Sequence, residues 1–308
     1  MKLFPDGEKI FEVISRYDDL LALEEKEGYE PGDTLALIVP FLVLHDISEN
    51  DISTLAAKAS LTGGAADLIY QLEVDGWKVF CISTSYQQFA LHITHKLGIY
   101  SHRVACTTFP LNQFRNSLTN EESDLIKQAE QDILSLHPPD DDDRVKKALG
   151  SFYWEKLPKT GIGTAMQQVK PTGGRRKVAA LNKFAEANNQ PLSEWAVVGD
   201  SITDVRMLEA VDEAGGLAIA FNANEYALPP ATMSLASTSI DDLREVLNTW
   251  QKSQRNGAEK LIKQKERVGG TGDTKNFHWI AGRKDLDDII QTHKRLRRQV
   301  REDAGKLG

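Results

Sequence analysis

The stretch Val197-Val198-Gly199-Asp200-Ser201-Ile202-Thr203-Asp204 indicates the fold most directly. The apolar run 195–198 predicts a buried strand, which Gly199-Asp200 ends. Residues 203–211 have helical spacing, so the strand passes into a helix through a short turn. In an open parallel sheet, ligands bind at the carboxyl ends of the strands. Asp200 is therefore predicted to face a crevice, and Asp204, about one helical turn later, is predicted to reach the same site.

Two carboxylates in this arrangement suit Mg²⁺, a hard ion that takes oxygen ligands in octahedral geometry. Asp200 and Asp204 are thus predicted metal ligands, with the remaining positions left for water and substrate oxygens. The alternative is structural, with Asp200 as a turn residue and Asp204 as a helix N-cap. The spacing of the two aspartates leaves both interpretations open.

Strands and helices alternate around this motif, from residue 65 to residue 221. Predicted strands are 77–82, 103–108, 195–198 and 216–221, and the predicted helices between them are 65–75, 86–98, 175–187 and 203–211. Such alternation predicts an α/β protein with a parallel sheet and helices on both faces. Residues 7–60 and 121–136 are predicted to be helical, and linker-like sequence begins at residue 254.

Two further polar groups are candidates for binding an anion. Ser83 and Thr84 directly follow the predicted strand 77–82, where hydroxyl and backbone N–H groups at a helix start bind phosphate. Helix capping is the simpler explanation of the same residues. Lys177 begins the helix before the Gly-Asp strand and is suited to neutralising a phosphoryl group. Arg176 is an alternative, and a merely solvated lysine is the plainer interpretation.

The amino-acid composition limits the kinds of molecule that this protein is expected to bind. A formal net charge of -8 and a pI near 5.5 argue against a general nucleic-acid role, which needs a basic face. A small phosphorylated substrate remains compatible, because a metal ion and one lysine supply local positive charge. The longest apolar run, 35–44, is far shorter than the roughly 20 residues of a membrane span, and no signal peptide is evident. We expect a cytoplasmic protein.

The order of these motifs resembles a known enzyme superfamily. A strand followed by Ser83, then Lys177, then Gly-Asp-x-x-x-Asp is similar to motifs two, three and four of the haloacid-dehalogenase-like (HAD) hydrolases. Ala-Phe-Asn-Ala-Asn at 220–224 resembles the end of the last core strand in phosphoserine-phosphatase-like members. Phrases at 17–19, 28–35, 82–86 and 222–228 are similar to an archaeal HAD-like family that includes proteins labelled energy-converting hydrogenase A subunit R. The resemblance covers about residues 5–250.

That resemblance implies an architecture and a reaction. The fold would be a three-layer Rossmann-like parallel sheet, divided into a helical cap (1–62), a first core part (63–111), a helical insertion (112–172), a second core part (173–250) and a C-terminal helical tail (251–308). The reaction would be Mg²⁺-dependent phosphomonoester hydrolysis through an aspartyl-phosphate. The implied roles are catalytic for Ser83 and Lys177, cofactor-binding for Thr84 and Asn222, and Mg²⁺-binding for Asp200 and Asp204.

The sequence departs from the family at its first motif, a strand ending in Asp-x-Asp that supplies the nucleophile. Asp6 has no strand before it. Asp46 ends the apolar run 42–46, but Pro40 interrupts that run and Ser48 stands where the second acid belongs. The resemblance also places this stretch in a cap helix. We therefore expect the central first strand to be missing from this chain, and we expect no turnover of phosphate esters.

A second function class follows from the same sequence. The fold alone does not establish catalysis, so a non-catalytic accessory subunit of a hydrogenase-type or other complex is the alternative. Its docking element would be the basic C-terminal helix, which contains Lys294, Arg295, Arg297, Arg298 and Arg301. A solvated charged face is the plainer explanation of that run.

Overall fold

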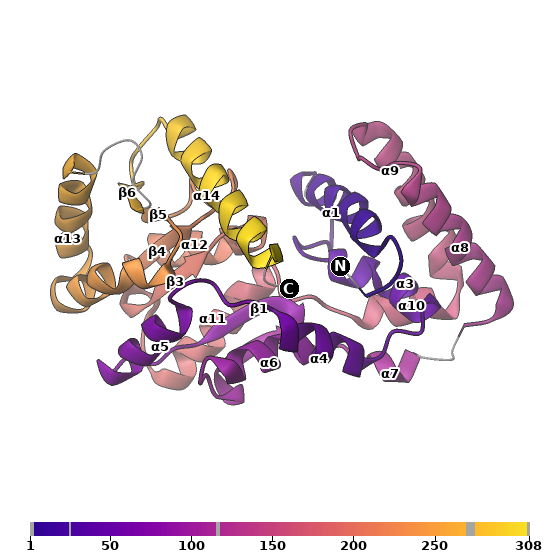
Figure 1. The fold of residues 1–308 in the computed structure, drawn as a ribbon, viewed down its shortest axis with the longest axis horizontal. Helices are drawn as coiled ribbons and strands as arrows, with labels where there is room; N and C mark the ends of the chain where they lie inside the picture. Colours follow the sequence, from indigo (N-terminus) through magenta and orange to yellow (C-terminus); the bar gives the residue numbers. More distant parts are fainter. Residues whose placement is uncertain (1–2, 25, 115–117, 269–274, 307–308) are drawn as a thin grey trace. The chain divides into compact units, whose positions relative to one another are not determined.

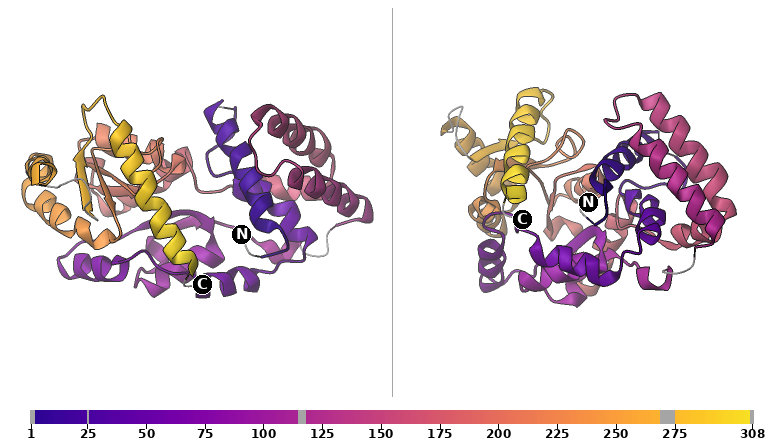
Figure 2. Two further views of the ribbon diagram at one scale, coloured as in Figure 1. Left: turned by 45° about the horizontal axis from the view of Figure 1, so that its top comes forward. Right: turned by 45° about the vertical axis from the view of Figure 1, so that its right-hand side comes forward.

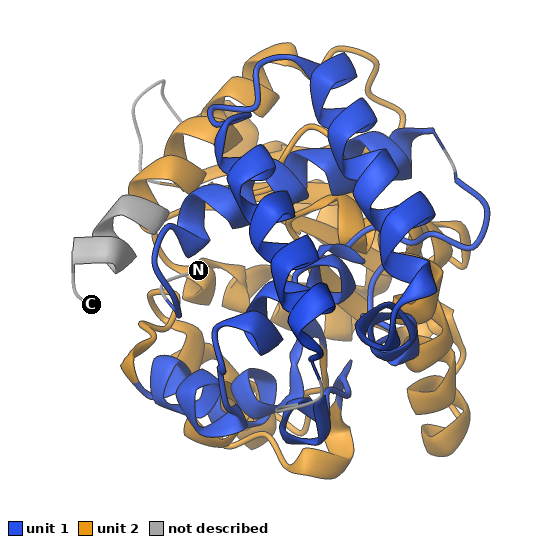
Figure 3. Cartoon of the chain, turned by 90° about the vertical axis from the view of Figure 1, so that its right-hand side faces the viewer, with its two compact units in different colours: residues 1–57, 83–92, 105–173 blue, residues 58–82, 93–104, 174–308 orange. Residues whose placement is uncertain are grey.

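The computed structural model describes residues 3–24, 26–114, 118–268 and 275–306, with side chains described as far as residue 300, residue 268 excepted. The chain forms two compact units, each assembled from three separate stretches (Figure 3). Unit 1 comprises Met1–Ala57, Ser83–His92 and Ala105–Gly173, and unit 2 comprises Lys58–Ile82, Ile93–Val104 and Gly174–Gly308. No helix in the described part of the chain is both long and apolar enough to cross a membrane.

Unit 1 is mostly helical. Its first helix, α1 (Gly7–Leu23), buries Ile10, Val13, Ile14 and Tyr17, which share one helix face. The other α-helices that contribute to its core are α2 (Thr34–Leu37), α3 (Val39–Leu44), α4 (Glu49–Lys58), α7 (Leu111–Phe114), α8 (Asn120–Leu134), α9 (Asp142–Gly150) and α10 (Gly161–Gln168). All of them contribute to one apolar core, so the helical segments on either side of residues 83–92 pack together. The division of the chain into five domains stays a prediction.

A two-stranded sheet, β1 (Cys81–Tyr86) with β2 (Val104–Thr107), corrects one predicted element. The predicted strand 77–82 was wrong in its bounds: the strand begins at Cys81 and runs through Ser83 and Thr84, and α6 (Gln87–Lys96) starts only afterwards. Tertiary contacts explain the difference. Thr84 is held on both sides, because its hydroxyl donates to the Thr172 carbonyl (3.0 Å) and its carbonyl accepts from the Thr107 hydroxyl (2.5 Å).

Unit 2 contains the larger sheet, with strands in the order β3 (Ala196–Gly199), β4 (Leu217–Phe221), β5 (Met233–Ser237) and β6 (Lys275–Trp279) (Figure 1). The first three strands are parallel, and β6 is antiparallel to β5. The predicted mixed α/β class with a parallel sheet is therefore confirmed. β5 and β6 were not among the predicted strands.

Helices cover both faces of this sheet (Figure 2). Leu217 and Ile219 of β4 face a core shared with α5 (Ala65–Val74) and α13 (Arg244–Val268). Ala218 and Ala220 face the opposite core, shared with α11 (Arg175–Asn188), α12 (Val205–Glu213) and α14 (Asp287–Lys306). Every residue of β4 is buried, as expected of a strand covered on both sides.

The predicted linker from residue 254 was wrong in its first part. α13 has a kink at Gln254, where φ is 50°, and then continues as helix to Val268. Ala258 and Ile262 are fully buried, which holds this second part of α13 against the sheet. Residues 269–274 of the predicted linker lie outside the described residues.

Candidate functional site

Asp204 is held by the turn that follows β3. Its Oδ2 accepts hydrogen bonds from the backbone N–H groups of Asp200 (3.0 Å) and Ser201 (3.1 Å), and from the Ser201 hydroxyl (3.2 Å). Gly199 is needed at the strand end, because a Cβ there would lie 2.6 Å from the Asp204 Cβ. The Gly-Asp-x-x-x-Asp sequence therefore folds a tight turn around its second carboxylate.

Lys177 forms an ion pair with the other carboxylate oxygen of Asp204. Its Nζ lies 2.7 Å from Oδ1, and the two side chains are only 7% and 6% exposed. The N–H of Gly174, just before α11, donates to the Thr203 carbonyl at 3.0 Å and ties the start of the helix to the same turn. Burial by itself raises the pKa of Asp204, but the Lys177 ammonium and the N–H donors outweigh burial and hold the pKa below its ordinary value. The result is a buried pair of opposite charges at the carboxyl end of β3.

Asp200 is the open carboxylate of this turn, with its side chain half exposed. Its Oδ2 lies 2.7 Å from Nη1 of Arg297, which reaches it from α14. The same guanidinium donates to the main-chain carbonyls of Asp200 (2.6 Å) and Asn222 (3.0 Å). The sequence reasoning missed this role of Arg297, because the two residues lie 97 positions apart and no local pattern links them.

Asn222 lies directly after β4 in a left-handed conformation, with φ at 45°. Its side-chain amide donates to the Ser237 carbonyl (2.7 Å), and its side-chain oxygen accepts from the Ser237 N–H (2.9 Å). The side chain is buried and fastens the end of β4 to the end of β5. Both ends of the amide are thus engaged within the unit, and its predicted cofactor contact stays a prediction.

His293 of α14 is a second residue that the sequence reasoning missed. It is fully buried, and its Nδ1 accepts a hydrogen bond from the Ala223 N–H at 2.9 Å. Burial, and then the nearby His278 and Arg297, lower the pKa of His293 to about 3. The imidazole is therefore neutral at physiological pH and serves to anchor α14 beside the turn after β4.

The basic run of α14 is only partly available to another molecule. Arg297 contacts Asp200, and Lys294 pairs with Glu225 at 3.1 Å. Arg295 and Arg298 are exposed, and the side chain of Arg301 lies outside the described residues. Binding of this helix to an acidic partner stays a prediction. In the described part of the helix, the exposed arginines would make that contact.

Ser83 and Thr84 belong to unit 1, whereas Lys177, Asp200, Asp204 and Asn222 belong to unit 2. The Ser83 hydroxyl accepts a hydrogen bond from the Ser85 N–H at 3.1 Å. Both residues lie within β1, and neither is at the start of a helix. The prediction that they form an anion site at a helix start was therefore wrong about the local structure. Their convergence with Asp200 stays a prediction.

The residues of the turn supply one part of a Mg²⁺ site. Asp200 offers a half-exposed carboxylate, but both oxygens of Asp204 are already engaged. Across the described chain, no group of three or more histidine, cysteine, aspartate or glutamate side chains is placed to hold a metal ion. By themselves, these residues do not fit a complete magnesium site.

Comparisons with known proteins show a shared fold. No protein-family model and no curated protein matches the chain. A solved structure described as "Structure of gene product AF1437 from Archaeoglobus fulgidus" is similar, with 25% sequence identity and a TM-score of 0.83. The match covers 100% of this chain and 92% of the Archaeoglobus chain. The present chain is thus similar over its whole length to this archaeal gene product.

Proposed function

We propose that the carboxyl end of β3 belongs to a phosphate-binding site of the HAD type, on a three-layer Rossmann-like core with a helical cap. The completed site would hydrolyse phosphomonoesters with Mg²⁺ through an aspartyl-phosphate. The buried Lys177–Asp204 pair carries this proposal. It fixes an ammonium group against the turn that carries the open carboxylate of Asp200, at the sheet edge where α/β proteins bind ligands.

Each side chain then has a separate task. Lys177 stabilises the negative charge of the phosphoryl group, and Asp204 acts as a positioning residue that holds and orients the Lys177 side chain. Asp200 is the Mg²⁺ ligand of the proposal. To take that role it would have to exchange the Arg297 guanidinium for the metal, and the ion would need a second carboxylate. Mg²⁺ supplies charge neutralisation at the phosphate when bound.

The nucleophile is not among the described strands. Of these strands, only β3 is followed directly by an aspartate. Asp46 follows helix α3, in a left-handed conformation with φ at 51°, and has no strand before it. The proposal therefore requires an aspartate from a strand other than those described, and without it we expect no turnover.

Binding, rather than turnover, is the direct test. Calorimetric titration with inorganic phosphate in the presence of Mg²⁺ is expected to show binding that Lys177→Met and Asp200→Asn each weaken by about tenfold or more, as expected for a lost charge-assisted contact. Glu209→Gln, an exposed carboxylate on α12 paired with Arg206, is the matched control and should leave binding unchanged. Phosphate binding that survives both site substitutions would refute the proposal.

One observation favours the second candidate, a non-catalytic accessory protein. Arg297 already neutralises Asp200, as in a turn that serves only structure. The substitution Arg297→Met separates the two candidates. For a phosphohydrolase site, removing the competing guanidinium tightens Mg²⁺ binding, whereas an accessory protein binds Mg²⁺ in neither form.

A further inference from the structure

The kink at Gln254 brings the two parts of α13 together (Figure 1). Lys265 of the second part forms an ion pair with Glu245 of the first part, with 2.6 Å between Nζ and Oε2. In a straight helix, two residues 20 positions apart would be about 30 Å apart along the axis. The bend therefore makes the two parts of α13 into two walls of one space, which the turn Ile240–Leu243 and the start of β6 complete.

A cavity of about 510 Å³ lies between these walls, all of them within unit 2. Its volume is in the range of small-molecule sites, roughly 300–1,000 Å³. Charged side chains dominate its lining, with seven of the ten lining residues carrying a charge. The basic ones are Arg244, Lys252, Lys265 and Lys275, and the acidic ones are Asp241, Asp242 and Glu245.

Ion pairs within the cavity wall account for the three carboxylates. Besides the pair of Glu245 with Lys265, Arg244 donates from Nε to Asp241 at 2.9 Å, and Lys275 lies 2.6 Å from Asp242. The Asp242 side chain is only 11% exposed, because it also accepts from the Ser237 hydroxyl, whereas Lys275 is 59% exposed. The carboxylate of this pair is thus shielded from solvent, and the ammonium group is not.

Lys252 is the basic residue of the cavity that has no such partner. Its side chain is exposed and makes no ion pair or hydrogen bond with the described residues. Four basic side chains therefore meet three acidic ones here, in a protein whose formal net charge is -8. This excess of positive charge favours an anion as the occupant.

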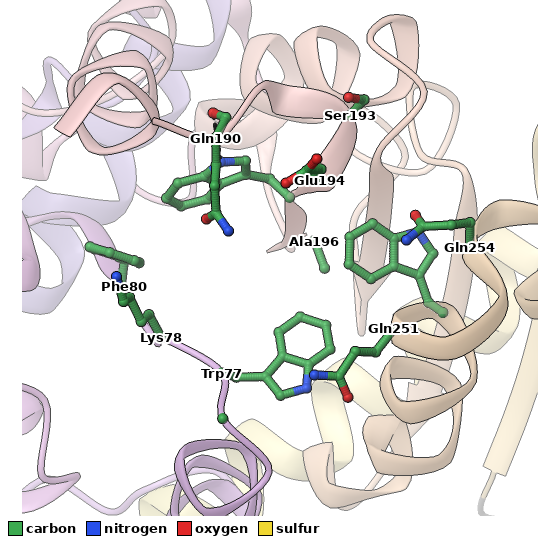
Figure 4. A pocket seen from close by; sticks show the side chains of 12 residues that line it. Trp77, Lys78, Phe80, Gln190, Ser193, Glu194, Ala196, Gln251 and Gln254 are labelled. Carbon is green, nitrogen blue, oxygen red and sulfur yellow. Dashed lines mark hydrogen bonds between the residues drawn. The ribbon is translucent and has the colours of Figure 1, made fainter. Parts of the chain in front are cut away.

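Another cavity of unit 2 has a different lining (Figure 4). It has a volume of about 450 Å³, and its walls come from the segment 76–80, the start of β3 and the part of α13 near the kink. Of the described residues that line it, only Lys78 and Glu194 carry a charge. The clustering of charge is thus a feature of the cavity between α13 and β6.

We propose that the cavity between α13 and β6 binds a small polyanion with a polyphosphate chain, through Lys252, Lys265 and Lys275. Lysine ammonium groups bind phosphate as point charges. An anion with several negative groups can contact more than one ammonium group at once, and so can compete with the carboxylates of the wall. An apolar ligand would desolvate these charges without replacing their contacts with water.

This site is distinct from the phosphohydrolase site of the previous proposal. Lys177, Asp200 and Asp204 lie outside the lining of the cavity. Lys177→Met and Asp200→Asn should therefore leave polyphosphate binding in the absence of Mg²⁺ unchanged. Lys252→Met should in turn leave the Mg²⁺-dependent binding of inorganic phosphate unchanged, so the two proposals can fail separately.

The test is calorimetric titration of the whole chain with inorganic triphosphate at low ionic strength without Mg²⁺. We expect binding that added salt weakens and that Lys252→Met weakens by about tenfold or more. Lys252 has no partner to lose, so this substitution should not disturb the fold. Lys260→Met is the matched control, because Lys260 is an exposed lysine of α13 outside the cavity, and it should have no effect.

A titration with ATP distinguishes two sources of the same chain. We expect both compounds to bind and Lys252→Met to weaken both. Tighter binding of ATP identifies a nucleotide as the ligand, and equal binding identifies the polyphosphate chain alone. Failure of triphosphate to bind, or equal weakening by Lys252→Met and Lys260→Met, would overturn the proposal.

A substitution of the opposite sign gives a second test. Glu245→Gln removes a negative charge from the cavity and releases Lys265 from its ion pair, so triphosphate binding should tighten severalfold. The Glu245 side chain is 61% exposed, and such surface pairs contribute little to folding, so the variant should keep its structure. Weaker or unchanged triphosphate binding in Glu245→Gln would contradict an anion site.

Discussion

Replacing Asp204 with asparagine is expected to lower the free energy of unfolding of unit 2 by about 3–5 kcal/mol, the usual cost of removing one partner from a buried ion pair. The size follows from burial, because Lys177 is 7% exposed and would be left as an uncompensated charge. The asparagine also keeps the shape of the side chain and one oxygen, so the N–H groups of Asp200 and Ser201 retain an acceptor. Loss of charge pairing is then the main effect.

A double-mutant cycle separates the pair from other consequences of the substitution. Lys177→Met removes the charge on the other side, and the double variant leaves a neutral pair. We expect the double variant to be more stable than the sum of the single changes predicts, by about 1–3 kcal/mol. Urea unfolding at neutral pH gives each value, provided that the signal reports on one unit.

Tryptophan emission can be restricted to unit 2. The chain has five tryptophans, and Trp154 is the one that lies in unit 1. In a Trp154→Phe background, emission therefore follows unit 2 alone. Glu259→Gln, which removes an exposed pair with Lys263 on α13, is the control and should cost less than about 0.5 kcal/mol. A cost below about 1 kcal/mol for Asp204→Asn, or strictly additive changes in the cycle, would refute the reasoning.

Two further predictions concern stability. Gly199→Ala forces a Cβ against Asp204 and should cost about 1–3 kcal/mol in urea unfolding, whereas Gly150→Ala, where a new Cβ would meet only a hydroxyl at 3.6 Å, should cost less than about 0.5 kcal/mol. For His293, the folded pKa of about 3 lies below the unfolded value of about 6.5, so the unfolded state alone binds a proton between these limits. This group should not affect the free energy of unfolding above pH 6.5, but it should lower that energy by about 3 kcal/mol at pH 4.5. His293→Gln should make the free energy of unfolding less dependent on pH in this range. The same pH dependence in His293→Gln and in the unsubstituted protein would contradict the assigned burial.

The part of the fold that sequence predicted correctly depends on short-range patterns. The strand, Gly-Asp turn and helix around residues 195–213 all follow from neighbouring residues, and the structure has β3, a tight turn and α12 there. Gly199 shows why, because the turn requires a residue without a Cβ next to Asp204.

The errors arise where distant residues decide the structure. The hydroxyl-rich sequence of β1 is typical of a turn followed by a helix cap. Hydrogen bonds of Thr84 with Thr107 and Thr172 nevertheless hold this stretch as a strand. The lysine-rich second part of α13 resembles a linker, yet Ala258 and Ile262 are buried against the sheet. Arg297 and His293 reach the turn after β3 and the turn after β4 from a helix near the end of the chain. No local sequence pattern identifies such partners.

The chain passes from one unit to the other five times, after residues 57, 82, 92, 104 and 173. During synthesis on a ribosome, α5 therefore emerges long before the sheet that it covers. Its apolar residues Leu68 and Leu72 stay unburied until β4 and α13 have been made. Contacts so distant along the chain form slowly, because long loops have to close first. We expect the nascent polypeptide to gain its native structure late, and its newly made amino-terminal half to depend on chaperones until the last helices are complete.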